Sequence, residues 1–278
     1  MTSKLSIIIP SRTETYLQKT IDDLLEKAEE EIQVVVVLDG YWPNKFNWSD
    51  PKIVVVHHGT PEKNKGMRAS INVGMAVAKG EYVMKLDEHC MVDKGFDVKL
   101  KADCKDDWVV IPRRYRLDAD NWKVIEDGRP PIDYMYIENK GGYLHGTLWD
   151  AKAKERKDIL IDDLMTFQGS CWFLKKSYWE KIGPMDDVNY GPFSNEAQEI
   201  GNKVWLSGGR VVVNKKTWYA HWHKDSSGYN FTNEQQKEFN ESVAKGRVYS
   251  ADYWLNNKWD NRTYDYKWLE DKFSPLPK

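Results

Sequence analysis

Residues 32–38 read IQVVVVL and are followed by Asp39-Gly40, so a run of mostly β-branched side chains ends at a turn-forming pair. A strand without polar alternation is typical of a parallel sheet that helices cover on both faces. On its N-terminal side lie another apolar segment, residues 5–10 (LSIIIP), and residues 16–30, where apolar side chains recur at helical spacing. The order strand, helix, strand predicts a right-handed βαβ unit.

The same alternation continues downstream and predicts the fold class. The patterns indicate strands over residues 52–57, 81–86, 108–112 and 210–214, regular structure over 168–174, and helices over 67–78, 176–181 and 196–206. We therefore expect an α/β domain over residues 1–225, with a Rossmann-like, mostly parallel central sheet and flanking helices. Ligands of such sheets bind outside the carboxyl ends of the strands.

Two regions depart from this alternation. Residues 118–160 show no strong period, and an irregular stretch of that length predicts a functional insertion. Residues 226–278 form a C-terminal extension, in which a polar helix over residues 233–245 precedes an aromatic-rich tail. The tail contains Tyr249, Tyr253, Trp254, Trp259, Tyr264, Tyr266 and Trp268.

Composition argues against several classes of protein. The chain has 41 Lys+Arg against 43 Asp+Glu, so no overall positive field marks it as a nucleic-acid binder. Its longest apolar runs fall short of the roughly 18 residues that a membrane helix needs, and we see no signal peptide. Cys90, Cys104 and Cys171 form no CxxC pair, which suits a reducing compartment. We expect a soluble cytoplasmic protein without a membrane anchor or an obligate protein partner.

The sharpest local pattern is Asp87-Glu88-His89, directly after a predicted strand. In an extended segment, a carboxylate and an imidazole two residues apart point to the same side and can share a divalent cation. His221 and His223 follow the last predicted strand and are candidates for a third ligand. Such a ligand set suits Mn²⁺ or Mg²⁺ better than a structural zinc ion. The alternative is an ordinary polar strand end.

Two further groups of charged residues lie at the starts of predicted helices. Glu196 and Glu199 share one helix face, which suits acid–base chemistry if the helix begins at the cleft. The alternative is that they only stabilise the helix dipole. Lys65 and Arg68 lie where cations and backbone N–H groups can bind a diphosphate. The alternative is that both are ordinary solvated charges on the surface.

Together these motifs resemble those of the GT-A glycosyltransferases. The likeness rests on residues 6–10 (SIIIP), Asp39, residues 65–68 (KGMR) and residues 86–90 (LDEHC). The Asp-x-His form is similar to the metal motif of the polypeptide N-acetylgalactosaminyltransferases, whereas family 2 enzymes more often have Asp-x-Asp. Residues 196–209 (EAQEIGNKVWLSGG) resemble, without a gap, the Glu-x-x-Glu helix of the former family, which ends in Trp-x-x-Gly-Gly.

The resemblance implies a role for each matched residue. The implied ligands of Mn²⁺ or Mg²⁺, facing the diphosphate of a UDP-sugar, are Asp87, His89 and His221. The implied donor-binding residues are Pro10, Ser11, Arg12, Asp39, Lys65, Arg68, Asp87, Gln168, Gly169, Ser170 and Phe193. Glu196 would face the reacting centre, with Glu199 beside it as a second catalytic candidate. The nucleotide-sugar half would cover residues 1–105, and the acceptor half residues 106–225.

One departure from the family pattern concerns the lid over the donor. The family's Trp-Gly-Gly before the first glutamate is Phe193-Ser194-Asn195 in this chain, which leaves the choice of sugar open. The stereochemical outcome is open as well, because the two resembled families differ in it.

The chain also resembles glycosyltransferase-like proteins of bacteriophages, which implies a hydroxymethylated pyrimidine in DNA as the favoured acceptor and the host cytoplasm as its location. Cations that could grip phosphates are Arg113, Arg114, Arg116, Lys258, Arg262 and Lys267, and the aromatic tail could stack an extruded base. Alternatively, the tail packs over the domain core.

Other hypotheses about the function stay open. The acceptor could be a peptide Ser/Thr, a glycan or a small-molecule hydroxyl, and a silent carbohydrate-binding module would keep the same fold. A sugar-nucleotide pyrophosphorylase is disfavoured, because Ser11-Arg12-Thr13 stands where that class has a glycine-rich loop.

Overall fold

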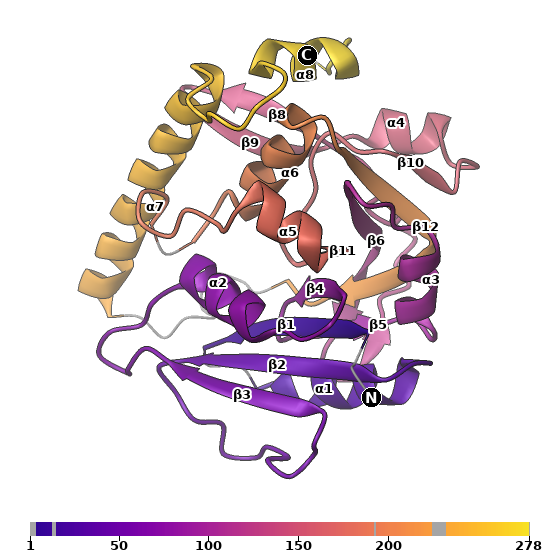
Figure 1. Cartoon of the computed structure of the whole chain (residues 1–278), viewed down its shortest axis with the longest axis vertical. Coiled ribbons are helices and arrows are strands. Elements are labelled where there is room, and N and C mark those ends of the chain that lie inside the picture. The colour runs from indigo at the N-terminus through magenta and orange to yellow at the C-terminus, as the bar shows by residue number, and fades with distance from the viewer. Residues whose placement is uncertain (1–3, 13–14, 192, 224–231, 278) are drawn as a thin grey trace.

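The computed structural model describes residues 4–12, 15–191, 193–223 and 232–277, which form a mixed α/β domain around one long sheet (Figure 1). In spatial order, the main path of the sheet contains β10 (Ile161–Asp163), β12 (Arg210–His221), β6 (Trp108–Asp118), β11 (Cys171–Lys175), β4 (Tyr82–Leu86), β1 (Leu5–Ser11), β2 (Ile32–Asp39) and β3 (Ile53–His58). From β4 to β3 every pair is parallel, whereas β11 runs antiparallel between β4 and β6. The α/β fold class predicted from the sequence is confirmed.

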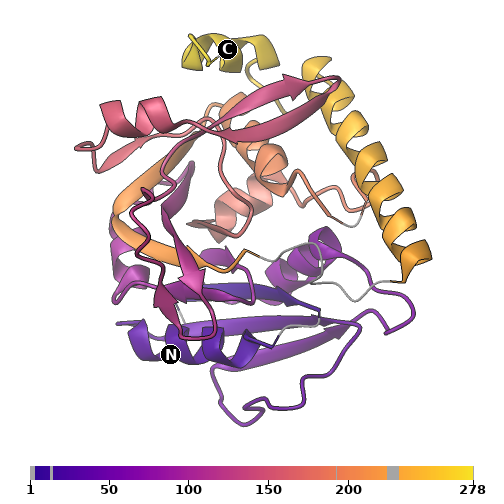
Figure 2. The same cartoon turned by 180° about the vertical axis from the view of Figure 1, so that it is seen from behind.

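Apolar cores lie on both faces of this sheet because side chains of β2 alternate between them. Val35 and Val37 join the core on one face, and Val34 and Val36 join the core on the other. The helices on the first face are α2 (Met67–Val77), α5 (Lys176–Ile182) and α6 (Glu196–Leu206). Those on the second face are α1 (Leu17–Lys27) and α3 (Phe96–Ala102). Figure 2 shows α1 in front of the parallel strands. Burial on both faces explains the unbroken apolar run of β2.

Strands β6 and β12 are longer than predicted. The sequence patterns indicated residues 108–112 and 210–214, but β6 continues to Asp118 and β12 to His221. The two strands pair in parallel as far as His221 opposite Arg116. Their outer halves are held by this backbone pairing and begin with charged residues, Arg113 and Arg114 in β6 and Lys215 and Lys216 in β12, which interrupt the apolar pattern.

Residues 118–160 are not the irregular stretch that was expected, whereas their role as a functional insertion stays a prediction. This stretch contains β7 (Lys123–Val124), β8 (Met135–Lys140), β9 (Tyr143–Leu148) and α4 (Asp150–Glu155). β8 and β9 form a hairpin whose turn is Gly141-Gly142, with φ of 59° and 95°. Positive φ at both positions is what a tight hairpin turn requires, and the glycine pair was the missed signal.

The helix predicted over residues 233–245 is also longer in the structure, where α7 spans Asn233–Leu255. Trp254 of α7, Trp259, and Tyr266 of α8 (Tyr266–Phe273) are buried in the same core as α6. These three rings therefore cannot stack an extruded base in this structure, and the expectation that the tail packs over the domain core is the correct one for them.

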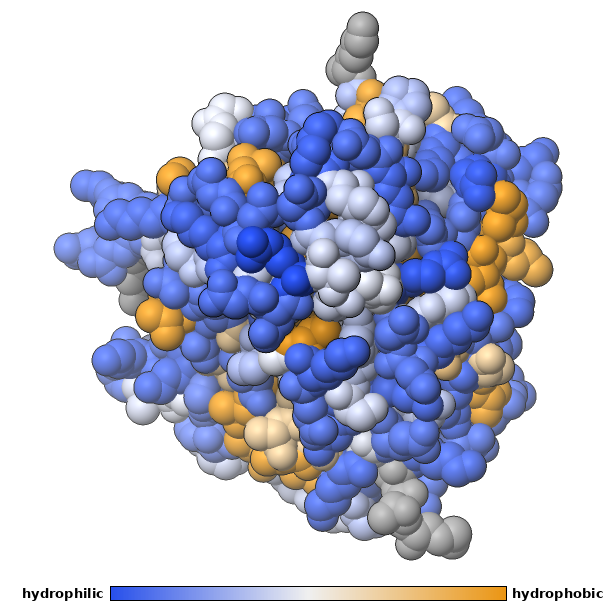
Figure 3. Space-filling view, turned by 45° about the horizontal axis from the view of Figure 1, so that its top comes forward, coloured by the Kyte–Doolittle hydropathy of each residue, from blue (hydrophilic) through white to orange (hydrophobic). Residues whose placement is uncertain are grey.

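The face of the domain shown in Figure 3 is mostly hydrophilic. On the face shown in Figure 3, apolar residues form separate small patches, as is usual for a folded domain. Among the described ranges, no helix combines the length and the hydropathy that a membrane span needs.

Two helical glycines give opposite expectations for substitution by alanine. A Cβ at Gly246 of α7 would clash with the Tyr190 carbonyl oxygen, whereas a Cβ at Gly201 of α6 would have Phe167 at 3.7 Å, an ordinary contact. We expect Gly246→Ala to lower the free energy of unfolding by about 1–3 kcal/mol through overpacking. Gly201→Ala should raise it by up to about 1 kcal/mol through helix propensity. Urea unfolding of both variants checks this; equal effects would contradict the packing of α7 on Tyr190.

Candidate active site

Three side chains meet at the edge of the sheet where β4 and β12 end. Asp87 follows β4, His89 precedes β5 (Cys90–Val92), and His221 is the last residue of β12. Nε2 of His221 lies 3.1 Å from Oδ2 of Asp87 and 3.1 Å from Nε2 of His89. One ligand atom from each of the three lies within 4.8 Å of the others. The structure thus gathers the three residues that the sequence suggested as metal ligands.

The segment that carries Asp87 and His89 is a turn, and not the extended segment that was expected. β4 pairs with β11 whereas β5 pairs with β12, so the chain has to change direction between them. The backbone N–H of Asp87 donates to the Ser170 carbonyl at 2.9 Å, which ties the turn to the residue before β11. A turn, and not strand alternation, therefore brings the two side chains together.

The electrostatics of the cluster favour cation binding. Burial alone would raise the pKa of Asp87, but the Lys85 ammonium and the hydrogen bond from His221 outweigh it and hold the pKa well below its usual range. Burial lowers the pKa of His221 to about 3 against the opposing effect of Asp87. At neutral pH the cluster thus contains an ionised carboxylate and a neutral imidazole, the protonation states that bind metals.

The donor set also fits a hard or borderline divalent cation. It contains a carboxylate oxygen and two imidazole nitrogens, whereas burial raises the pKa of the nearby Cys90 thiol, which therefore stays protonated and a poor ligand. An Arg114 nitrogen donates to Nδ1 of His221 at 3.1 Å, so the proton of the neutral ring lies on Nε2. For Nε2 to bind a metal, this proton has to move to Nδ1, and the contact with Arg114 has to open.

Glu196 lies beside the loop that holds Asp87. It is the first residue of α6, and its Oε1 accepts a hydrogen bond from the Ser194 N–H at 3.0 Å. Its Oε2 lies 3.7 Å from the position that a Cβ on Gly169 would take. Since Gly169 is bonded to Ser170, which accepts from the Asp87 N–H, one loop connects the glutamate with the candidate metal ligands.

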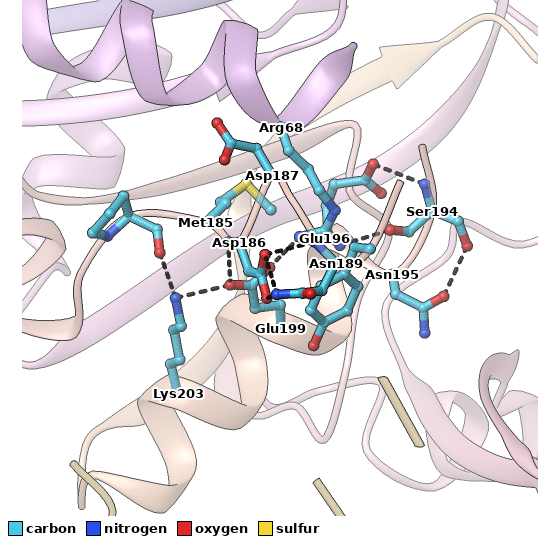
Figure 4. A network of polar contacts seen from close by, with 12 residues as sticks. Arg68, Met185, Asp186, Asp187, Asn189, Ser194, Asn195, Glu196, Glu199 and Lys203 are labelled. Atoms are coloured by element: carbon cyan, nitrogen blue, oxygen red, sulfur yellow. Dashed lines mark hydrogen bonds and ion pairs between the residues drawn. The ribbon is translucent and has the colours of Figure 1, made fainter. Parts of the chain in front are cut away.

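Arg68 and Glu199 lie in a buried network that also includes Ser194 and Glu196 (Figure 4). The Arg68 guanidinium forms an ion pair with Glu199, donates to the Ser194 carbonyl at 2.6 Å, and stacks on the Tyr190 ring at 4.0 Å. Glu199 also binds Lys203 at 2.8 Å. Both side chains are at most 2% exposed. Their ion pair and the hydrogen bond from Arg68 to Ser194 hold the first turn of α6 against the rest of the domain. The diphosphate contact expected of Arg68 and the catalytic role expected of Glu199 stay predictions from the sequence.

The predicted uridine-binding residues lie at the carboxyl ends of β1 and β2. The two carboxylate oxygens of Asp39 accept from the backbone N–H groups of Lys65 and Gly66, at 2.7 and 2.8 Å. This carboxylate therefore closes the loop before α2, while the Lys65 side chain is exposed. At the end of β1, the Ser11 hydroxyl is hydrogen-bonded to that of Tyr41, and the next residue, Arg12, donates its backbone N–H to Oε2 of Glu88 at 3.1 Å.

The remaining candidates are placed less uniformly. Ser170 is buried, and its hydroxyl lies 2.8 Å from that of Tyr219, whereas Gln168 is half-buried. Phe193 is 37% exposed, and its ring lies 6.1 Å from Phe239 of α7. His223 is exposed and lies outside the metal-ligand cluster.

The basic side chains that were expected to bind DNA phosphates form hydrogen bonds or ion pairs within the chain. Arg113 binds Asp133 with two hydrogen bonds, and Arg114 is buried behind His221. Lys258 pairs with Asp252, and Lys267 pairs with Asp271. Arg116 donates to the Pro130 carbonyl, and Arg262 to that of Trp259. The expected basic patch is therefore wrong for Arg113 and Arg114, whose charges support the fold.

Comparison with known proteins identifies the family. Residues 6–183 match the glycosyl transferase family 2. This chain belongs to that family. Glycosyltransferase GlyG of Streptococcus pneumoniae is 30% identical over 79% of this chain and 65% of that protein. Mouse polypeptide N-acetylgalactosaminyltransferase 3 is 23% identical over 90% of this chain, which spans only 41% of that relative.

Solved structures support a GT-A fold for this family 2 chain. GalNAc-T7, in a crystal structure with UDP, GalNAc and Mn²⁺, superposes with a TM-score of 0.69 and 14% identity, covering 98% of this chain and 56% of that one. S. aureus TarS 1-349, in complex with UDP-GlcNAc, superposes with a TM-score of 0.57 and 16% identity, covering 96% and 69%. At these identities the likeness concerns the fold.

Two residues that contact the candidate metal ligands, Lys85 and Arg114, were not predicted from the sequence in that role. Lys85 is buried next to Asp87, and a charged residue inside the apolar segment VMKL was the signal that could have revealed it. Arg114 was grouped with its basic neighbours, although alternate residues of a strand face opposite sides and only Arg114 binds His221.

Proposed function

We propose that this family 2 chain is a metal-dependent glycosyltransferase that moves a sugar from a UDP-sugar to an acceptor hydroxyl. The observation that carries the proposal is the convergence of Asp87, His89 and His221 at the carboxyl edge of the sheet, with Glu196 of α6 beside the adjoining Gly169 loop. Mn²⁺ or Mg²⁺ held there would stabilise the negative charge of the departing UDP. The Mn²⁺ and UDP in the related GalNAc-T7 structure support this choice.

Each part of the site has a task in this proposal. Asp87, His89 and His221 hold the cation, and the loops after β1 and β2 bind the uridine. Residues 168–170 line the sugar, with Phe193 near the lid. Glu196 orients the reacting hydroxyl or removes its proton, because its carboxylate is fixed by the Ser194 N–H and lies beside that loop. Residues 1–105 would serve the donor, residues 106–225 the acceptor, and residues 226–278 would brace the domain.

For the acceptor we propose a peptide Ser/Thr hydroxyl. The support is that several relatives are polypeptide N-acetylgalactosaminyltransferases. The alternative, a hydroxymethylated pyrimidine in phage DNA, has lost the support of Arg113, Arg114 and the three buried aromatic residues of the tail. A bacteriophage origin stays a prediction from the sequence alone.

Removal of the metal should abolish turnover. We expect UDP release from a panel of UDP-sugars to fall to background in EDTA and to return with Mn²⁺, because Asp87 and His221 would then lack the cation that stabilises the leaving group. Parallel reactions would contain Ser/Thr peptides, hydroxymethylated DNA, unmodified DNA or no acceptor.

The pattern of release separates the hypotheses. Stimulation by peptide supports the proposed acceptor, whereas stimulation by hydroxymethylated DNA alone replaces it with the DNA alternative. Equal turnover with and without EDTA would contradict the metal centre. Binding of UDP-sugar without release under any condition would favour the silent carbohydrate-binding module.

A further inference from the structure

A lysine is buried in the middle of the sheet, two residues before Asp87. Lys85 of β4 is 2% exposed, and its neighbours Met84 and Leu86 are apolar core residues. Lysine is almost never this deeply buried unless its ammonium is paired. Since strand side chains alternate, Lys85 lies on the face of β4 that turns toward α2 and α6, together with Val83.

The Lys85 ammonium has two partners, which belong to different loops. It forms an ion pair with Oδ1 of Asp87 and donates to the Gly169 carbonyl at 2.7 Å. The other oxygen of Asp87, Oδ2, lies 3.1 Å from Nε2 of His221. The two oxygens of the Asp87 carboxylate thus have different partners, because Oδ1 pairs with Lys85 and Oδ2 faces the imidazole of His221.

The second partner connects Lys85 to the catalytic glutamate. Gly169 lies against Glu196, whose Oε2 is 3.7 Å from the position of a Cβ on that glycine. One buried ammonium therefore spans from a metal ligand to the loop that contacts Glu196. Groups that hydrogen-bond metal ligands from behind fix the orientation of those ligands, and their loss typically weakens metal binding about 10–100-fold.

We propose that Lys85 is a positioning residue that fixes Asp87 for the cation and the Gly169 loop for the sugar. The inference rests on the proposed function, because it assigns Lys85 a task within the same site. The charge and the two hydrogen bonds carry that task, while the aliphatic stem of the side chain only fills the core.

The test compares Lys85→Met with a matched control, Lys215→Met. Lys215 is also buried, at 8% exposed, and its ammonium donates to a backbone carbonyl, that of Arg156, at 2.7 Å, with no contact to the metal ligands. Calorimetric titration with Mn²⁺ should show the Kd raised about tenfold or more in Lys85→Met and within about twofold of the wild type in Lys215→Met. At saturating Mn²⁺ we expect kcat of Lys85→Met to stay low, because the Gly169 loop is still released.

Other outcomes would overturn the proposal. A folded Lys85→Met protein with the wild-type Kd for Mn²⁺ would do so, and loss of Mn²⁺ binding in Asp87→Ala would show that the metal site itself stands. A wild type that does not bind Mn²⁺ would remove the metal centre and this inference together. If circular dichroism shows that Lys85→Met is unfolded, Lys85→Gln takes its place, since it cannot span both partners; an unchanged Kd in that variant also overturns the proposal.

Discussion

Metal-dependent UDP release by Asp87→Asn is expected to fall about 10³-fold below that of the wild type. Asparagine keeps the shape of the side chain but removes the negative charge that lies between Lys85 and the two imidazoles. The several kcal/mol of charge stabilisation that a bound cation supplies correspond to a factor of this size. The measurement is kcat/KM for the donor at fixed Mn²⁺.

Asp103→Asn is the matched control for this variant. The Asp103 side chain is 16% exposed and pairs with Lys216, much as Asp87 is 15% exposed and pairs with Lys85. It lies outside the candidate metal-ligand cluster, so kcat/KM should stay within about twofold of the wild type. Retention of more than about a tenth of the wild-type turnover by Asp87→Asn would contradict the role of this carboxylate.

The second large effect concerns stability. We expect Arg68→Met to lower the free energy of unfolding by about 3 kcal/mol, because it leaves the Glu199 carboxylate buried without its arginine partner. Lys203 remains beside Glu199, which keeps the loss at the lower end of the range for broken buried ion pairs, about 3–5 kcal/mol. The change also removes the hydrogen bond to the Ser194 carbonyl, which holds the backbone just before Glu196.

Urea unfolding of Arg68→Met beside Lys267→Met checks this expectation. The pair Lys267–Asp271 joins two exposed side chains one helical turn apart, and such pairs contribute about 0–1 kcal/mol. If Arg68→Met lowers the free energy of unfolding by less than about 1 kcal/mol, the buried Arg68–Glu199 ion pair does not stabilise the domain. In that case Arg68 would be free to serve the donor, as the sequence had suggested.

Much of the fold could be predicted from local pattern. The apolar segments of β1, β2 and β4 and the helical periods of α1 and α2 specify parallel βαβ units, because burial on both sheet faces requires side chains without polar alternation. The same local logic places Asp39 at the end of β2 and Asp87 directly after β4, at the sheet edge where ligands bind. For these features each residue needs only its near neighbours in sequence.

Contacts between distant segments were decided only by the tertiary structure. Arg68 was expected at the diphosphate and Glu199 at the reacting centre, but in the structure the two side chains form a buried ion pair that joins α2 to the first turn of α6. Lys85 and Arg114 gained their partners in the same way, from the Gly169 loop and from His221 at the end of β12. A charged side chain carries no local sign of what it will pair with. Burial makes pairing necessary, and the packing of remote elements determines the partner.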